Sequence, residues 1–296
     1  MSHSFQSARY AAARAIALEA GRHALACFEQ RERLVVEYKG VQDAVSIADR
    51  DVEDLVRSRI ASQFPEDRFL GEESAALAQQ TSAQCASRAL WIVDPIDGTS
   101  CFLHGMYAWC VSIAVVIDGE PAIGVVYDPN ADELFHAETN GGAWIDANAT
   151  KGEVQRRALQ VADAAGARDG VLGVGISHRV SSAPFLAFIE RWLASGGMFV
   201  RNGSGALMLA YTAAGRLIGY YEPHMYAWDA VAGIVLVTEA GGSTNAFLAD
   251  DGLARGNAVI AANARVYGEL RTGIEAADFF AARMHTCAEE ACVTSG

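Results

Sequence analysis

Two carboxylates and a hydroxyl follow an apolar run in the segment WIVDPIDGT, residues 91–99. The apolar part is typical of a buried strand, and the proline and glycine after it favour a tight turn, so Asp94 and Asp97 would be held stiffly. Oxygen ligands of this kind suit hard divalent cations such as Mg²⁺, which also contacts substrate phosphate. The same dipeptides occur in ordinary turns, so this segment alone leaves both interpretations open.

Further carboxylates stand at the ends of two other predicted elements. Glu72 and Glu73 follow a short apolar pair, and Asp229 opens an apolar helical stretch. Neighbouring side chains on an extended segment point to opposite sides, so at most one of the two glutamates is expected to bind a cation, and we choose Glu72. Asp229 is also compatible with the first turn of a helix, where a carboxylate stabilises the helix dipole.

These motifs, in this order, resemble those of the inositol monophosphatase family of metal-dependent phosphomonoesterases. The resemblance rests on GEE at residues 71–73, DPIDGT at 94–99, and WD at 228–229 with TEAGG at 238–242. It implies an α/β (α+β) fold, a layered αβαβα sandwich of the inositol monophosphatase and fructose-1,6-bisphosphatase type. It also implies an N-terminal half, residues 1–150, with most metal ligands, and a C-terminal half, residues 151–296, with Asp229 and the substrate-side residues.

The family pattern further implies a site for two or three Mg²⁺ ions. The implied ligands are the side chains of Glu72, Asp94, Asp97 and Asp229 and the main-chain carbonyl of Ile96. The implied catalytic residues are Asp49, Thr99 and Glu72, in which Asp49 would pair with the Thr99 hydroxyl and help orient or deprotonate the attacking water. Metal ions that acidify water and stabilise the leaving oxygen require no covalent phosphoenzyme.

The substrate side is also carried over from the resemblance. The implied contacts are Gly98, Thr99, Ser204, Gly205, Glu222 and Asp229. The implied reaction is hydrolysis of inositol monophosphate, with histidinol phosphate, fructose 1,6-bisphosphate and 3′-phosphoadenosine 5′-phosphate as rival substrates. An alternative of another class is a regulatory binding protein that keeps the fold without turnover.

Two positions depart from the family pattern. Cys101 stands where the family usually has asparagine, and a thiol cannot reproduce the paired donor and acceptor of an amide. Ile218 stands where many relatives have aspartate. Local hydrogen bonding and substrate preference are therefore expected to differ from those of typical members.

Composition limits the partners and the compartment. A formal net charge of −13 over 296 residues argues against a nucleic-acid partner, because phosphate backbones are bound by clustered Lys and Arg. The six cysteines form no Cys-x-x-Cys pair, which favours a reducing compartment, and no apolar stretch approaches the length of a membrane span. We therefore expect a cytoplasmic protein, and the resemblance implies a homodimer.

The elements that position these residues follow from hydrophobic periodicity. Helices are predicted at 5–28 and 49–63, and strands at 89–93, 109–117, 123–128 and 133–137 form a meander. The second half alternates strands at 170–175, 199–201, 217–221 and 258–261 with helices at 184–195, 205–214 and 229–239. A weak boundary between the halves falls at 148–165. Periodicity alone indicates only a mixture of helices and strands.

Overall fold

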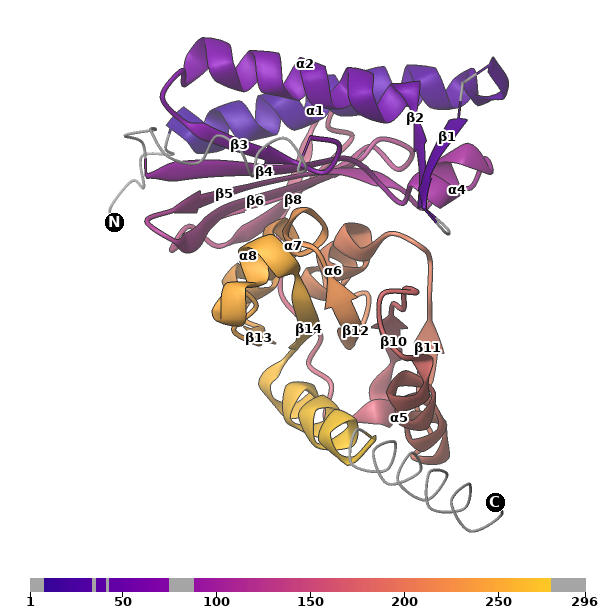
Figure 1. Cartoon of the computed structure of the whole chain (residues 1–296). Helices are drawn as coiled ribbons and strands as arrows, with labels where there is room; N and C mark the ends of the chain where they lie inside the picture. Colours follow the sequence, from indigo (N-terminus) through magenta and orange to yellow (C-terminus); the bar gives the residue numbers. More distant parts are fainter. Residues whose placement is uncertain (1–7, 34–35, 41–42, 75–87, 278–296) are drawn as a thin grey trace, which may run out of the picture.

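The protein consists of alternating layers of helices and sheets. The computed structural model describes residues 8–33, 36–40, 43–74 and 88–277. In Figure 1 the layers follow from top to bottom as helix, sheet, helix, sheet and helix. This confirms the predicted αβαβα sandwich. The proposed division into residues 1–150 and 151–296 stays a prediction, and β9 from beyond residue 150 belongs to the first sheet.

The first sheet has seven strands in the order β3-β4-β5-β6-β7-β8-β9. The strands are β3 (Arg68–Gly71), β4 (Ala89–Asp97), β5 (Cys110–Ile117), β6 (Glu120–Asp128), β7 (Glu133–Glu138), β8 (Ala143–Ala147) and β9 (Gln155–Ala158). From β4 onwards every pair is antiparallel, which confirms the predicted meander, whereas β3 pairs with β4 in parallel.

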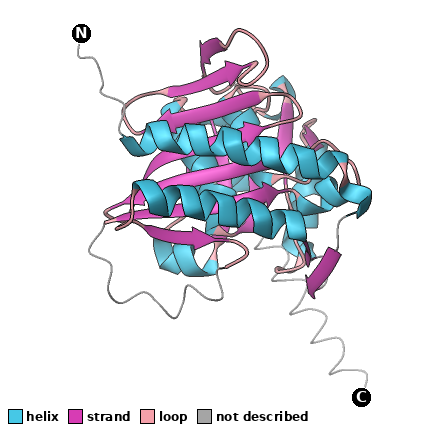
Figure 2. Cartoon of the chain, turned by 90° about the horizontal axis from the view of Figure 1, so that it is seen from above, coloured by secondary structure: helices cyan, strands magenta, loops and turns pink. Residues whose placement is uncertain are grey.

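Helices α1 (Ala8–Glu29) and α2 (Ile47–Gln63) cover the outer face of this sheet, side by side in Figure 2. In α1 the buried residues Ala13, Ile16, Ala17, Ala20 and Ala24 recur at the spacing of one helix face. Small alanines allow α1 to approach β5 and β6 closely. The outer helical layer thus follows from the amphipathic pattern in the sequence.

The middle layer is formed by α6 (Gly205–Ala213) and α7 (Ala227–Glu239), which are buried on nearly all sides. Both are apolar around their whole circumference, and such a helix is stable only when other elements cover it completely. Their side chains join those of both sheets in one core, with Leu207, Leu209, Val231 and Leu236 at most 1% exposed. The middle layer therefore joins the two sheets.

The second sheet has five strands in the order β11-β10-β12-β14-β13. The strands are β10 (Val171–Val174), β11 (Met198–Val200), β12 (Gly219–Met225), β13 (Ser243–Thr244) and β14 (Asn257–Ala262). Helix α5 (Ser182–Ala194) and the helical residues 264–277 cover its other face, around the buried residues Phe188, Trp192 and Leu270.

Several elements differ from those expected. The predicted strand 89–93 continues to Asp97 as β4, because the sheet pairs this backbone further than its apolar side chains extend. Strands β8 and β9 were not expected from the sequence.

The remaining short elements are β1 (Val36–Gly40), β2 (Asp43–Ser46), α4 (Thr99–Leu103), α8 (Gly252–Arg255), η1 (Arg31–Arg33), η2 (Ala167–Asp169) and η3 (Ala249–Asp251). Cys85, Cys287 and Cys292 lie outside the described residues.

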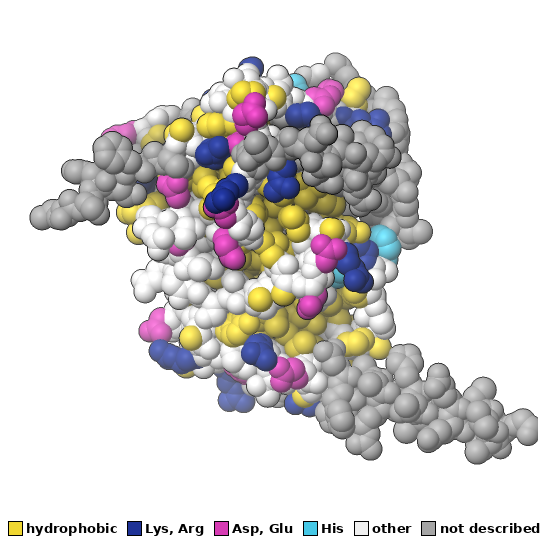
Figure 3. Space-filling view, turned by 60° about the vertical axis from the view of Figure 1, so that its left-hand side comes forward, with side chains coloured by type: hydrophobic (Ala, Val, Ile, Leu, Met, Phe, Trp, Pro, Cys, Tyr) yellow, Lys and Arg dark blue, Asp and Glu magenta, His cyan; other side chains and the backbone are white. Residues whose placement is uncertain are grey.

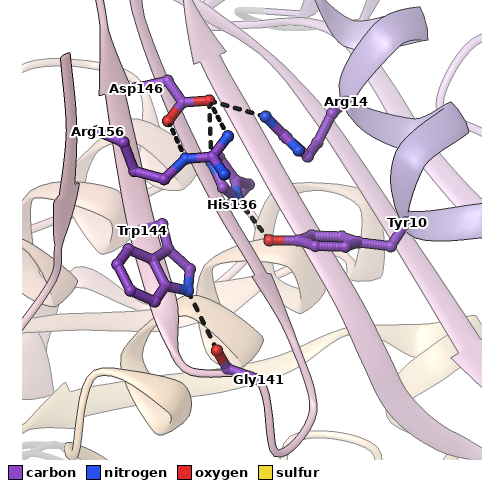
Figure 4. Close-up of polar contacts among 7 residues, drawn as sticks. All are labelled: Tyr10, Arg14, His136, Gly141, Trp144, Asp146 and Arg156. Atoms are coloured by element: carbon purple, nitrogen blue, oxygen red, sulfur yellow. Dashed lines mark hydrogen bonds and ion pairs between the residues drawn. The ribbon is translucent and has the colours of Figure 1, made fainter. Parts of the chain in front are cut away.

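A polar cluster joins α1 to strands β7, β8 and β9 of the first sheet (Figure 4). Asp146 accepts two hydrogen bonds from Arg156, at 2.7 and 2.8 Å, and one from Arg14 at 2.8 Å. His136 Nε2 lies 3.3 Å from the same carboxylate, and the Tyr10 hydroxyl lies 2.5 Å from His136 Nδ1. Burial opposes the charge of Asp146, but these partners hold its pKa below the ordinary range. The cluster therefore holds α1, β7, β8 and β9 together.

The molecular surface combines charged and apolar regions. On the face drawn in Figure 3, hydrophobic side chains gather near the middle, with Lys, Arg, Asp and Glu scattered around them. Within the described ranges, no helix combines the length and the apolar character that crossing a membrane requires.

Candidate metal centre and active site

Three carboxylates from two distant parts of the chain meet between the sheets. Asp94 and Asp97 belong to β4, and Asp229 to the first turn of α7, and each offers an oxygen within 4.8 Å of the others. Asp229 also accepts a hydrogen bond from Tyr226 N at 3.1 Å, so it caps α7 as well. The structure thus brings together residues that stand more than a hundred positions apart in the sequence.

An irregularity in β4 places Asp94 and Asp97 on the same side. In a regular strand, residues three apart point to opposite faces. Asp94 lies opposite Ser112, whereas Asp97 lies opposite Cys110, so β4 contains one residue more than β5 between these pairs. Within the bulge, Ile96 N donates to Asp94 Oδ1 at 2.9 Å. The bulge therefore turns two acids of one strand into a pair of candidate ligands.

The N-terminus of α6 holds Asp97 in place. Asp97 Oδ2 accepts hydrogen bonds from Ser204 Oγ at 2.5 Å and from Ala206 N at 2.7 Å. Ser204 is 1% exposed and also caps α6 through Leu207 N. The observed partner of Ser204 is thus Asp97, and a contact between Ser204 and a substrate stays a prediction.

Glu72 lies beside this cluster. Its backbone continues the β3–β4 pairing through Glu72 N, which donates to Val93 O at 3.1 Å. Its charge contributes to raising the pKa of Asp94, after the larger effect of burial. Glu73 N instead donates to the carboxylate of Glu53. The choice of Glu72 over Glu73 as the candidate ligand stays a prediction.

Glu53 is a buried acid that the sequence reasoning missed. It lies on α2, one turn after Asp49 and therefore on the same helix face. Its Oε2 accepts from Glu73 N at 2.8 Å, and its Oε1 pairs with Arg57 at 2.6 Å. A Cβ on Gly71 would lie 2.2 Å from Glu53 Oε2, so a larger residue there would displace the Glu53 carboxylate. A charged residue among buried apolar neighbours on one helix face was the available signal.

Glu53 positions the backbone of Glu73, which directly follows the candidate ligand Glu72. We therefore expect Glu53→Gln to weaken Mg²⁺ binding about tenfold to a hundredfold, the usual cost of losing a residue that supports a metal ligand. A glutamine has one acceptor oxygen, so either Glu73 N or Arg57 loses its partner. The measurement is the Mg²⁺ dependence of phosphate release. Asp54→Asn on the exposed face of the same helix is the control. A lower kcat with unchanged Mg²⁺ dependence would contradict this role.

Asp49 and Thr99 meet as the resemblance implied. The Thr99 hydroxyl lies 3.3 Å from Asp49 Oδ1 and 3.1 Å from Ile96 O, so its single proton is shared between two acceptors. Asp49 Oδ2 accepts from both Ser46 N and Ser46 Oγ, at 2.8 and 2.7 Å. Burial raises the pKa of Asp49 despite these hydrogen bonds. The raised pKa makes this carboxylate a better proton acceptor than an ordinary aspartate.

The electrostatics of the cluster fit a divalent cation. Burial and then the charges of Glu72, Asp97 and Asp229 raise the pKa of Asp94, and Asp94 is hydrogen-bonded to Asp229. Burial also raises the pKa of Asp97 to about 7 and that of Asp229 to about 6. Carboxylates this close cannot all remain charged without a cation. Oxygen donors alone favour Mg²⁺ or a similarly hard ion.

These pKa shifts predict how Mg²⁺ affects stability at different pH. Asp97 and Asp229 bind protons more tightly in the folded protein, because their pKa values lie above the ordinary 3.8. Their contribution to the metal-free protein therefore decreases as the pH rises from about 4 to 7. Mg²⁺ replaces those protons, so the Mg²⁺-induced increase in Tm should be larger at pH 8 than at pH 5. Thermal melts with and without Mg²⁺ measure this, and equal increases would contradict it.

The remaining predicted substrate residues surround the cluster. Gly98 has a φ of 97°, a left-handed conformation that favours glycine, and it begins the one-turn helix α4. Gly205 N contributes a hydrogen bond to Asp97. Glu222 lies on β12 and accepts a hydrogen bond from the Tyr220 hydroxyl at 2.5 Å. Their contacts with a substrate stay predictions.

The two departures from the family pattern lie in different surroundings. Cys101 is buried, and its thiol donates to Asn202 O at 3.2 Å in the loop before α6. Ile218 is 4% exposed and packs in the core of the second sheet, where the charge of an aspartate would be buried. Cys101 is therefore near the site, whereas Ile218 serves packing.

An apolar groove elsewhere on the molecule does not contain these acids. It has a volume of about 550 Å³ and is lined by one side of α7, including Val231 and Val235, and by residues such as Phe247. We therefore locate the site from the chemistry and geometry of its side chains and not from cavity size.

Known proteins share the fold and the order of these elements. The model of the inositol monophosphatase family matches residues 5–277. The chain belongs to the inositol monophosphatase family. It is 39% identical over 228 residues to an inositol-1-monophosphatase of Mesorhizobium japonicum, covering 76% of this chain and 80% of that relative.

Two other relatives carry a different name. The chain is 35% identical over 228 residues to the Nus factor SuhB of Xylella fastidiosa, which covers 76% of this chain and 77% of that relative. The crystal structure of the extragenic suppressor protein suhB of Bartonella henselae matches with a TM-score of 0.78 and 31% identity, over 90% of this chain and 98% of that one. Family membership supports a metal-dependent phosphatase. Relatives named inositol-1-monophosphatase and relatives named SuhB are both similar to this chain.

Proposed function

We propose that the protein hydrolyses a small phosphate monoester with the help of Mg²⁺, and that inositol monophosphate is the leading candidate substrate. The observation that carries the proposal is the convergence of Asp94, Asp97 and Asp229 from opposite halves of the chain, with Glu72 beside them. The name of the Mesorhizobium relative supports the choice of substrate.

In the proposed reaction, Glu72, Asp94, Ile96 O, Asp97 and Asp229 would hold Mg²⁺, and the bound metal would supply charge that stabilises the phosphoryl oxygens and acidifies water. The chain orients that water through the Thr99 hydroxyl, which lies against Asp49. Asp49 takes up a proton from this water as the water oxygen attacks phosphorus. The bond from phosphorus to the alcohol oxygen then breaks, the leaving oxygen takes up a proton from solvent water, and the products are the alcohol and inorganic phosphate.

A phosphate-release panel tests this proposal. It compares inositol monophosphate with histidinol phosphate, fructose 1,6-bisphosphate and 3′-phosphoadenosine 5′-phosphate, first with Mg²⁺ and then with excess chelator. We expect Mg²⁺-dependent release that is highest for inositol monophosphate among compounds with a single phosphate. Release that persists in chelator would contradict the metal-dependent mechanism. Release from none of the compounds would contradict the activity.

A regulatory binding role is the second candidate function. It is favoured by the similarity to a relative named Nus factor SuhB. The same panel separates the two candidates, because a binding protein without turnover would release no phosphate from any compound. The complete set of acids at the candidate site favours the enzyme.

We also propose that the protein forms a homodimer and works in the cytoplasm. An exposed apolar face formed by α5 and the edge strand β11 supports the dimer: Leu186 is 60% and Met198 62% exposed, and Phe199 is 39% exposed. Light scattering of the protein and of Met198→Glu would test it, because a charge in the interface should favour the monomer. The buried free thiols of Cys101 and Cys110 support a reducing compartment.

A further inference from the structure

Tyr220 places a hydroxyl group inside the apolar core between the two sheets. The residue lies on β12 and is 1% exposed. Its ring belongs to the same core as the buried side chains of Met208, Leu217 and Met225. A phenylalanine would fill this space equally well, and a buried hydroxyl costs free energy unless it has a hydrogen-bond partner. Packing alone therefore does not account for the hydroxyl of Tyr220.

The partner of this hydroxyl is a carboxylate on the same strand. Tyr220 Oη donates to Glu222 Oε2 at 2.5 Å. Residues two apart on a strand point to the same face of the sheet, so the regular backbone between them brings the two side chains together. This face is turned toward the N-terminus of α6, because a Cβ on Gly205 would lie 3.4 Å from the Tyr220 hydroxyl oxygen. Tyr220 thus holds Glu222 from the side of the core.

The loop after β10 holds the same carboxylate from another side. A Cβ on Gly175 would lie 2.0 Å from Glu222 Oε2 and 2.6 Å from the Tyr220 hydroxyl oxygen. Gly175 N donates to Tyr221 O at 3.0 Å, which fixes this backbone against β12. A larger residue at position 175 would therefore displace the hydroxyl or the carboxylate. Oε2 of Glu222 is thus restrained by both the core and the loop.

Glu222 lies beside the candidate metal centre and leaves one oxygen free. Burial raises the pKa of Asp229, and the charge of Glu222 adds to that increase. The set of acids whose oxygens lie within 4.8 Å of one another nevertheless consists of Asp94, Asp97 and Asp229, without Glu222. Among the residues that the structure describes, no donor contacts its second oxygen, Oε1. This oxygen therefore remains available to a molecule bound at the centre.

We propose that Tyr220 is a positioning residue: by holding Oε2 of Glu222, it directs Oε1 toward the hydroxyl groups of a polyol whose phosphoryl group lies at the metal centre. An ionised carboxylate can only accept hydrogen bonds, and the hydroxyls of a polyol can donate them. Hydrogen bonds to a charged group are stronger than those between neutral groups, so their placement affects affinity. The inference rests on the proposed phosphatase activity and adds a determinant of its preference for polyol esters.

The test compares Tyr220→Phe with the unaltered protein on inositol monophosphate and on phenyl phosphate, whose alcohol part has no further hydroxyl. We expect KM for inositol monophosphate to rise about tenfold, as for loss of a hydrogen bond to a charged group, with little change in kcat. Both constants for phenyl phosphate should stay unchanged, whereas a purely structural role would impair both substrates. Tyr221→Phe removes a hydroxyl from the opposite face of β12 and is the control.

A double-mutant cycle shows whether Tyr220 acts through Glu222. In the Glu222→Gln background the carboxylate is absent, so adding Tyr220→Phe should raise KM for inositol monophosphate much less than it does in the unaltered protein. An equal rise in both backgrounds would overturn the proposed role. Thermal melts of each variant check that the fold is retained.

The possible results distinguish this inference from the proposed function. Equal changes on both substrates, or no change on inositol monophosphate, would overturn the role of Tyr220 and leave the phosphatase activity intact. Turnover of phenyl phosphate without turnover of any polyol phosphate would do the same. Turnover of neither would contradict the activity, and titration calorimetry with both compounds and Mg²⁺ then decides. Weaker binding of inositol monophosphate alone in Tyr220→Phe supports the inference, and equal effects on both compounds overturn it.

Discussion

Asp94→Asn should abolish phosphate release and leave the fold intact. Asp94 lies at the centre of the cluster, and its charge interacts with those of Glu72, Asp97 and Asp229. Asparagine keeps one oxygen but loses the negative charge that a hard cation requires. We expect kcat/KM to decrease by more than the ~100-fold that typically follows loss of a residue supporting a metal ligand.

The stability of this variant separates a lost ligand from a lost fold. Burial and neighbouring negative charges favour the protonated form of Asp94, and asparagine has nearly the same shape and no charge. The Tm without metal should therefore stay close to that of the unaltered protein, while the Mg²⁺-induced increase in Tm should disappear. Asp118→Asn, in an exposed turn, is the control. Normal phosphate release by Asp94→Asn would remove the basis of the proposed mechanism.

Much of the fold was predictable because the hydrophobic pattern of each segment matches the layer in which it is buried. The one-sided apolar pattern of α1 agrees with its place on the outer face of the first sheet, and the apolar circumference of α7 agrees with its burial between two sheets. The alternation and turns of residues 109–137 indicated an antiparallel meander. Strand β9, by contrast, is exposed along its whole length and carries Arg156 and Arg157, so it gave no hydrophobic signal.

The candidate site was predictable in its residue types and less so in its geometry. The acids were recognisable because motifs on separate elements occur in a family order, and the structure brings them together. The bulge between Asp94 and Asp97 depends on pairing with β5, which no local pattern determines. The contact of Ser204 with Asp97 and that of Glu53 with Glu73 likewise join residues that only the folded chain brings close.

Asp49→Asn should lower kcat about a hundredfold to ten-thousandfold, as expected for loss of a general base, with little change in Mg²⁺ dependence. Ser46 donates two hydrogen bonds to Asp49 Oδ2, so the asparagine oxygen should face Ser46 and its NH₂ group should face Thr99. The group beside the Thr99 hydroxyl then becomes a donor that cannot accept a proton. Steady-state kinetics at saturating Mg²⁺ measure the effect.

A double-mutant cycle with Thr99→Val shows whether Asp49 acts through Thr99. Valine keeps the branched shape of threonine and removes the hydroxyl, which lies between Asp49 Oδ1 and Ile96 O. If the two residues work as one unit, the double variant should be about as slow as the slower single variant, because the second change removes an interaction already lost. Losses that multiply would instead show that Asp49 and Thr99 contribute independently, and the proton acceptor would then have to act on water directly.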